Sequence, residues 1–189
     1  MSTAEIKFGG FGGQGVILAG MIIGRAASIY DNKFATLTQS FGPEARGSAC
    51  SAQVIVSDDR ILYPYVTKPQ ILMVMSQESC NKFLSETTED ATVIIEEELV
   101  KPKGLKPGMK LFAIPATRFA EELGRKMVLN IVMVGFFTAV TKLVDCNAVR
   151  EAVKTSVPKG TENLNLQAFD RGYEYGISLA QGSAAPVIQ

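Results

Sequence analysis

The sequence predicts a three-layer α/β/α domain of the Rossmann-like kind, with a mainly parallel, partly mixed sheet and a helical C-terminal third. Apolar runs typical of strands alternate with helical patterns over short connections, which is the order of a parallel sheet covered by helices. A glycine-rich turn joins the first strand to the first helix, and beyond Gly124 the remaining patterns are helical. We expect residues 1–180 to form a single domain and residues 181–189 a flexible tail.

The strands are predicted from short, strongly apolar runs that are bounded by turn residues. They are expected at 6–8, 34–37, 52–56, 70–75, 92–95 and 110–115. After the third strand, a turn at Ser57 to Asp59 and the run Arg60 to Tyr63 predict a hairpin. The sheet should therefore contain some antiparallel pairing.

The helices are predicted from apolar periodicity and from capping residues at their starts. They are expected at 16–30, 76–84, 117–123, 129–143, 147–155 and 163–179, with Thr117 and Asp145 as caps. The apolar stretch from Met127 to Val140 is interrupted by Asn130 and is shorter than the roughly 20 residues that span a bilayer. We expect it to form a buried helix.

Composition and charge restrict the classes of function. A chain of 189 residues with 47% hydrophobic and 20% charged residues has the make-up of a globular protein with one substantial core. The 19 basic residues balance the 19 acidic ones, so no net field attracts nucleic acid or an anionic membrane. The segment from Met1 to Glu5 lacks the basic and apolar regions of a secretory signal, which predicts a cytoplasmic protein.

The chain is poor in the residues that hold metals and clusters. Cys50, Cys80 and Cys146 are far apart in the sequence, and there is no histidine. An iron–sulfur segment brings several thiolates close together, and zinc sites commonly use imidazole. We expect the cysteines to be small buried hydrophobes in a reducing compartment, and no metal site on this chain.

The glycine-rich stretch from Gly9 to Gly15 lies between the first strand and the first helix, which is the order that a phosphate-binding loop requires. Glycines allow positive φ and a close approach of a ligand to main-chain N–H groups. The first turn of a helix adds unpaired N–H groups and the positive end of its dipole. The turn is therefore a candidate site for an anionic group.

Two other interpretations of this turn remain open. Gly10, Gly12 and Gly15 match the dinucleotide pattern G-x-G-x-x-G, which predicts an acidic residue at the end of the second strand for the ribose hydroxyls. The second strand instead ends in residues 38–40, Thr-Gln-Ser, so a nicotinamide ligand is disfavoured. A glycine turn that only permits close packing between helix and strand is the other alternative.

A second loop, residues 39–48, follows the second strand and is rich in Gly, Pro and small polar residues. Ligands of open α/β sheets bind beyond the carboxyl ends of the strands. Because both loops follow strands at their carboxyl ends, we expect them to lie on one rim and to form one site.

The two loops together resemble the gamma subunit of 2-oxoacid:ferredoxin oxidoreductases, and the resemblance covers nearly the whole chain. The segments that carry it are Gly9–Gly15, Ser40–Gly47, the strand that ends in Ser57-Asp58, Asn130–Gly135, Asn163-Leu164, Ala168-Phe169 and Gly172. The 2-oxoglutarate branch is the preferred assignment because of the separate short chain and the Gly-Pro-Glu-x-Arg-Gly sequence. The indolepyruvate and branched-chain 2-oxoacid branches stay open.

The resemblance implies a non-autonomous subunit of an enzyme that decarboxylates a 2-oxoacid oxidatively, transfers the acyl group to coenzyme A and passes electrons to ferredoxin. Thiamine diphosphate, Mg²⁺ and 4Fe-4S clusters are then expected on partner subunits, namely alpha, beta and a ferredoxin-like delta chain. A homodimer of this chain is a further expectation. This chain would contribute to binding coenzyme A, or would close the thiamine site from across an interface.

In this interpretation the chain has binding residues but no catalytic residue. N–H groups of the glycine turn face a phosphate, and Arg46, oriented by Glu44, bonds the phosphate or a substrate carboxylate. A Glu44–Arg46 ion pair that only shapes or docks the loop is the alternative. Phe11 and Phe41 are either walls of the site or interface anchors, and Asn130 is expected to be a satisfied buried polar group. The expected cofactor-binding residues are Gly10, Phe11, Gly12, Gly13, Gln14, Gly15, Ser40, Gly42, Pro43, Glu44, Arg46 and Gly47.

Two functions of other classes compete with this one. The first is a free-standing Rossmann-type oxidoreductase that uses NAD or a flavin. The second is a purely structural subunit whose glycine turn binds nothing.

Overall fold

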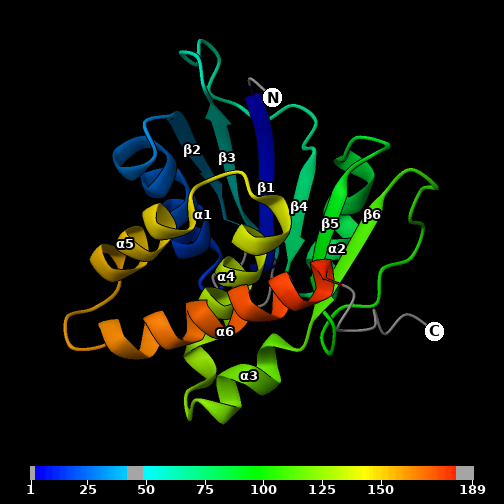
Figure 1. Ribbon diagram of the computed structural model, residues 1–189. Coiled ribbons are helices and arrows are strands. Elements are labelled where there is room, and N and C mark those ends of the chain that lie inside the picture. The colour runs from blue at the N-terminus through cyan, green and yellow to red at the C-terminus, as the bar shows by residue number, and fades with distance from the viewer. Residues whose placement is uncertain (1–2, 42–48, 182–189) are drawn as a thin grey trace.

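The computed structural model describes residues 3–41 and 49–181, and both lie in one α/β arrangement around a six-stranded sheet (Figure 1). The strand order is β2-β3-β1-β4-β5-β6. The strands are β1 (Thr3–Phe11), β2 (Phe34–Ser40), β3 (Ala49–Ser57), β4 (Ile71–Val74), β5 (Thr92–Glu96) and β6 (Lys110–Ile114).

The sheet is mixed, with one reversed strand. β1, β4, β5 and β6 pair in parallel, whereas β3 runs antiparallel to both of its neighbours, β1 and β2. The prediction of a mainly parallel sheet with some antiparallel pairing is thus confirmed. The predicted hairpin is wrong, since residues 60–63 form no strand. Both edges of β3 are occupied by β1 and β2, which leaves no position beside it for a returning arm.

Helices cover the two faces of the sheet unequally. In Figure 1, α1, α4, α5 and α6 lie in front of the sheet and α2 lies behind it. The front core is the larger, and a smaller cluster around Cys80 and Phe83 of α2 fills the back. The helices are α1 (Val16–Arg25), continued by the π-helix η1 (Ala26–Tyr30), α2 (Gln77–Phe83) with the 3₁₀ turn η2 (Leu84–Glu86), α3 (Ala116–Glu122), the 3₁₀ turn η3 (Lys126–Val128), α4 (Leu129–Thr141), α5 (Cys146–Ser156) and α6 (Glu162–Ala180).

Helix α4 is buried between the sheet and α6, as its apolar sequence predicts. Its contact with α6 is unusually close, since a Cβ atom at Gly135 would lie 2.0 Å from the main-chain oxygen of Phe169. A Cβ at Gly172 would lie 1.9 Å from the main-chain oxygen of Val132. Among the residues that the structure describes, no helix is long and apolar enough to cross a membrane.

The helix caps were predicted with mixed success. Asp145 caps α5, because its Oδ1 accepts from the N–H groups of Asn147 and Ala148 at 2.9 and 3.1 Å. Thr117 does not cap α3. The N–H of Thr117 instead donates to Glu96 Oε1 at 3.0 Å, so a carboxylate from β5 serves the start of this helix.

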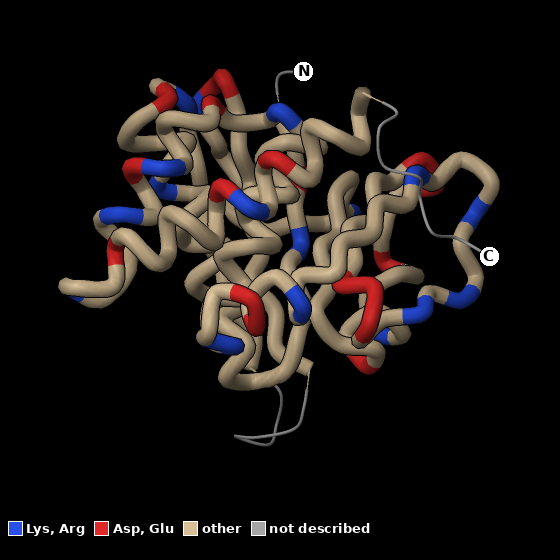
Figure 2. The backbone as a smooth tube through the Cα atoms, turned by 60° about the horizontal axis from the view of Figure 1, so that its bottom comes forward, with Lys and Arg blue, Asp and Glu red and all other residues tan. Residues whose placement is uncertain are grey.

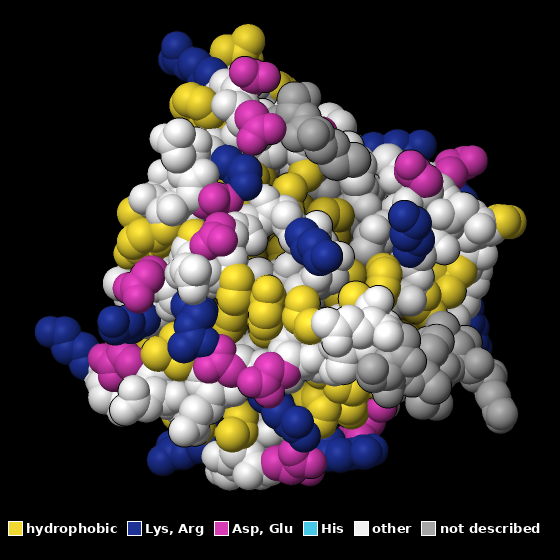
Figure 3. Space-filling view, viewed as in Figure 1, with side chains coloured by type: hydrophobic (Ala, Val, Ile, Leu, Met, Phe, Trp, Pro, Cys, Tyr) yellow, Lys and Arg dark blue, Asp and Glu magenta, His cyan; other side chains and the backbone are white. Residues whose placement is uncertain are grey.

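Charged residues of both signs are interspersed along the chain, as the backbone view of Figure 2 shows. On the face that carries α4, α5 and α6, short hydrophobic stretches lie between charged groups of both signs (Figure 3).

Candidate functional site

The glycine turn between β1 and α1 contains two residues in the left-handed region of backbone conformation. Gly13 has φ of 94° and Gly15 has φ of 74°. Side chains are disfavoured at such angles, which explains the glycines at these two positions. The N–H of Gln14 donates to the Phe11 oxygen at 3.1 Å and closes the turn.

The side chain of Gln14 fixes this turn to the sheet. Its Oε1 accepts from the Phe11 N–H at 2.7 Å, and its Nε2 donates to the Met75 oxygen at 2.9 Å. Both ends of the amide are therefore used within the protein. Gln14 holds the turn in shape, and its own main-chain N–H is occupied by the Phe11 oxygen.

The remaining donors of the turn are suited to an anion. Gly12 and Gly13 are exposed, and Gly15, the N-cap residue of α1, has no side chain with which to cap the helix. The first main-chain bond of the helix is that of Ala19 N–H to the Gly15 oxygen at 3.0 Å. The N–H groups of residues 16–18 precede it and carry the positive end of the helix dipole.

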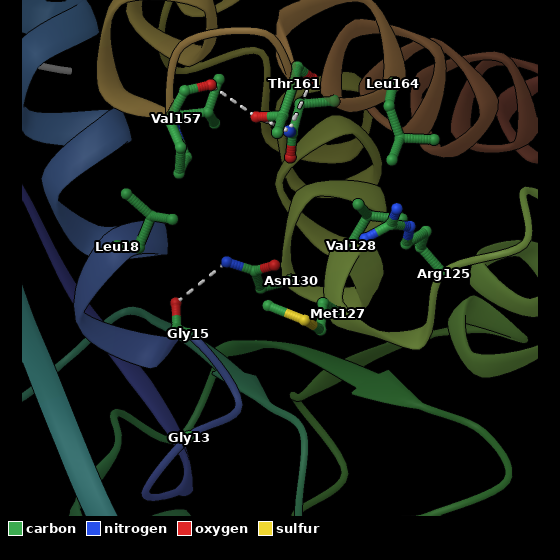
Figure 4. Close-up of a pocket in the computed structure, with 12 residues that line it drawn as sticks. Gly13, Gly15, Leu18, Arg125, Met127, Val128, Asn130, Val157, Thr161 and Leu164 are labelled. Atoms are coloured by element: carbon green, nitrogen blue, oxygen red, sulfur yellow. Dashed lines mark hydrogen bonds between the residues drawn. The ribbon is translucent and has the colours of Figure 1, made fainter.

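Asn130, at the start of α4, supports the turn from the other side. It is 3% exposed, and its Nδ2 donates to the Gly15 oxygen at 3.3 Å (Figure 4). A Cβ at Gly15 would lie 2.3 Å from this nitrogen, so glycine is required here for space as well as for φ. The interpretation of Asn130 as a satisfied buried group holds for its nitrogen.

Apart from Gln14 and Ser40, the predicted site residues fall into three sets. Gly12, Gly13 and Gly15 form the turn, with Phe11 half-buried at its start. Gly10 is buried in β1, and a Cβ there would lie 2.7 Å from both Gln14 Oε1 and Val16 Cγ2, so its role is close packing. Outside the described residues lie Gly42, Pro43, Glu44, Arg46 and Gly47.

The strand registers place both loops at the same edge of the sheet. Phe11, the last residue of β1, is opposite Ala49, and Ser40, the last residue of β2, is opposite Ser51. The described ends of the second loop thus lie at the rim from which the glycine turn emerges. Ser40 and Phe41 are both exposed there.

A cavity of about 280 Å³ opens beside the glycine turn, between the starts of α1, α4 and α6 (Figure 4). Its walls are mainly apolar, with two asparagine amides and one guanidinium. The residues that line it are Gly13, Gly15, Leu18, Arg125, Met127, Val128, Asn130, Val157, Pro158, Thr161, Leu164 and Asn165. A second hollow of about 260 Å³ adjoins the other side of the turn, with Gln14 and Lys126 in its lining.

Sequence reasoning missed this cavity and its cation. Arg125 and Lys126 stand in the short segment between α3 and α4, more than a hundred positions from the glycine turn. Among the described residues Arg125 has no ion-pair partner, whereas Lys126 pairs with Glu121 at 2.8 Å. The sequence does show two cationic residues directly before an apolar helix. It does not indicate that the fold brings these two residues to the glycine turn.

The cysteines are not arranged for metal chemistry. Burial raises the pKa of the thiols of Cys50, Cys80 and Cys146, and the first two are buried among apolar side chains. Within residues 3–41 and 49–181, no group of three or more potential ligands could hold a metal ion.

The strand order argues against a nicotinamide site. In dinucleotide-binding folds the second strand lies beside the first, and its carboxyl end presents an acid to the ribose. Here the antiparallel β3 separates β2 from β1, and β2 ends in uncharged residues.

The parallel strands and the glycine turn define the class of this chain, an α/β domain of the Rossmann-like kind with a glycine-rich turn after its first strand. The chain belongs to the pyruvate ferredoxin/flavodoxin oxidoreductase family, whose sequence model matches residues 5–175. The resemblance to gamma subunits of 2-oxoacid:ferredoxin oxidoreductases is thereby confirmed.

Individual relatives agree with this assignment. The 2-oxoglutarate synthase subunit KorC of Methanocaldococcus jannaschii is 47% identical over 90% of this chain and 92% of its own length. The structure of a keto/oxoacid ferredoxin oxidoreductase gamma subunit from Geobacter sulfurreducens has a TM-score of 0.82 at 37% identity, covering 93% of this chain and 99% of that one.

A more distant structure shares the fold as part of a longer chain. It is the 2-oxoglutarate:ferredoxin oxidoreductase from Magnetococcus marinus with 2-oxoglutarate, coenzyme A and succinyl-CoA bound. The TM-score is 0.83 at 18% identity, and the match covers 93% of this chain but 31% of that one.

Proposed function

We propose that this chain is the gamma subunit of a 2-oxoglutarate:ferredoxin oxidoreductase and that its glycine turn binds a phosphate of coenzyme A. The observation that carries the proposal is the pair Gly13 and Gly15, whose positive φ angles open the turn in front of the free N–H groups of α1. A phosphate at this position would be held by main-chain donors and by the helix dipole.

The reaction itself takes place on other chains in this proposal. Thiamine diphosphate, Mg²⁺ and 4Fe-4S clusters belong to the alpha, beta and ferredoxin-like delta subunits, and electrons leave through the complex to ferredoxin. This chain binds and orients the acyl acceptor. The assembly is cytoplasmic, and pairing of two gamma chains within it is part of the same proposal.

The second loop completes the phosphate site in the proposal. Its described ends flank the rim of the glycine turn, and its guanidinium, Arg46, is matched to a phosphate in charge and geometry. Gly42, Pro43, Glu44 and Gly47 would shape this loop, and Ser40 begins it.

Co-purification tests the assignment. Partner subunits should accompany the tagged chain, and the complex should reduce ferredoxin with 2-oxoglutarate in preference to pyruvate or branched-chain 2-oxoacids, only when coenzyme A is present. A chain that purifies alone and reduces NAD would contradict it. In the complex, Arg46→Ala should raise the KM for coenzyme A with assembly intact. Loss of assembly with normal kinetics in the surviving complex would instead assign the loop to an interface.

A further inference from the structure

A larger cavity lies at the opposite edge of the sheet from the glycine turn, where the parallel strands begin. Its volume is about 380 Å³, and residues from the starts of β4, β5 and β6 and from the end of α4 line it. Figure 1 shows these strand starts above α6, which crosses the view lower down. A cavity of this size is within the range of small-molecule sites.

Part of the wall of this cavity is apolar. Ile71, Phe112 and Val140 line it, and each is half-buried and packed against the main core. Each side chain therefore leaves some apolar surface uncovered. An aliphatic group placed in the cavity would remove that surface from water, which is favourable.

The rest of the wall carries polar side chains that are free to bind a ligand. Asp90, Thr92 and Lys110 line the cavity, and the part of the chain that the structure describes offers their side chains no hydrogen bond and no ion pair. Gln70 also lines it, and only its Oε1 is used, accepting from the Glu5 N–H at 2.6 Å.

The sheet fixes the donors of this group next to each other. Thr92 and Lys110 are directly opposite in the parallel pair β5 and β6, so their side chains are on the same face of the sheet. The Thr92 N–H donates to the Gln70 oxygen at 2.9 Å, and the Lys110 N–H donates to the Ala91 oxygen at 3.0 Å. An ammonium group and a hydroxyl on neighbouring strands can both donate to a carboxylate.

The same cavity also favours a cation. Asp90 is an acceptor two positions before Thr92, in the turn that leads into β5. Thr141, the last residue of α4, lines the cavity as well, so the negative end of the α4 dipole adjoins it. An occupant that satisfies the whole wall has an ammonium group, a carboxylate and an aliphatic part.

We propose that this cavity binds a free aliphatic amino acid. Its ammonium group lies at Asp90, its carboxylate at Lys110 and Thr92, and its side chain against Ile71 and Phe112. The inference does not rest on the proposed function, because none of these residues belongs to the glycine turn.

The test is calorimetric titration of the full chain with L-leucine and three probes. The 2-oxoacid of leucine lacks the ammonium group, isoamylamine lacks the carboxylate, and L-alanine lacks most of the aliphatic side chain. Asp90→Asn and Lys110→Met each remove one charge at an exposed position, and unfolding midpoints equal to that of the parent show that both variants are folded. Asp59→Asn and Lys103→Met are the matched controls, since both residues are exposed and lie outside the cavity.

We expect L-leucine to bind and each probe to bind at least tenfold more weakly, because each probe lacks one of the three contacts. Lys110→Met should weaken L-leucine at least tenfold and leave isoamylamine unchanged. Asp90→Asn should weaken L-leucine and isoamylamine and leave the 2-oxoacid unchanged. Both controls should bind as the parent does. Absence of L-leucine binding would overturn the inference, and so would a 2-oxoacid that binds equally well or L-leucine binding that neither Asp90→Asn nor Lys110→Met alters.

Discussion

The amide of Gln14 donates to the main-chain oxygen of Met75 at 2.9 Å, although the two residues are 61 positions apart in the sequence. Because the same side chain accepts from the Phe11 N–H, it connects the ends of β1 and β4. The glycine turn is thus held in shape by one side chain, and both ends of its amide are bonded within the protein. Its geometry is therefore set by contacts within the chain.

Replacing Gln14 with leucine should loosen this turn. Two hydrogen bonds are lost and the Met75 oxygen loses a donor, so we expect about 1–3 kcal/mol of destabilisation in urea unfolding. Affinity for coenzyme A should fall as well, since the turn is no longer fixed. Gln167→Leu, at an exposed position of α6, is the control and should change neither. Equal stability of the two variants would show that the hydrogen bonds of the Gln14 side chain do not stabilise the fold.

The close contact of α4 and α6 should be intolerant of a single methyl group. Gly135→Ala and Gly172→Ala each place a Cβ against main-chain oxygen atoms, and overpacking of this kind costs about 1–3 kcal/mol or more. Gly24→Ala in α1 is the control, because its Cβ would meet only Val54 at 4.0 Å. This variant should gain about 0.5–1 kcal/mol from helix propensity. Thermal unfolding should show lower midpoints for Gly135→Ala and Gly172→Ala and a higher midpoint for Gly24→Ala. An unchanged midpoint for Gly135→Ala would contradict the close packing of α4 and α6.

Lys7 in β1 is buried, pairs with Glu86 and lies 4.3 Å from the centre of the Phe83 ring. Glu86→Gln removes only the anion and should destabilise the fold by about 1–2 kcal/mol. This cost is smaller than that of breaking a fully buried ion pair, because Glu86 is half-exposed. Lys7→Met removes the charge together with the need for a partner and should cost less. Denaturant midpoints of the two variants and of the double variant give the comparison. A larger loss for Lys7→Met would show that the ion pair itself is stabilising.

Glu97 should make stability depend on pH. Burial, and then the neighbouring Glu96 carboxylate, raise the pKa of Glu97 above its ordinary value of 4.5. A raised pKa in the folded state means that stability from this group is present below the unfolded pKa and is lost as the pH rises through the folded pKa. Glu97→Gln should therefore be more stable than the parent at pH 7, with no difference below pH 4.5. Unfolding midpoints measured from pH 4 to pH 8 test this, and a parent that is the more stable at pH 7 would contradict it.

The sequence predicted the strands, the glycine turn and the buried α4 because these depend on local patterns of apolar residues and glycine. It could not predict the exclusion of residues 60–63 from the sheet, since that depends on β1 occupying the position beside β3. Nor did it reveal that Glu96, rather than Thr117, serves the start of α3, because this contact joins positions 21 apart. Arg125 and Asn165 were missed for the same reason, since only the packing of α4 and α6 brings them to the turn.

The most direct test of the proposed phosphate site at the glycine turn compares two glycines with similar backbone geometry. Gly13 and Gly104 have φ of 94° and 79°, and a Cβ at either would meet no atom within 4 Å. Alanine at either position should therefore impose a similar strain of about 1–2 kcal/mol. Only the Cβ at position 13 would enter the space that we assign to a phosphate. Calorimetric titration of coenzyme A into the assembled enzyme should show at least tenfold weaker binding for Gly13→Ala and unchanged binding for Gly104→Ala, whereas equal affinities would contradict the phosphate site.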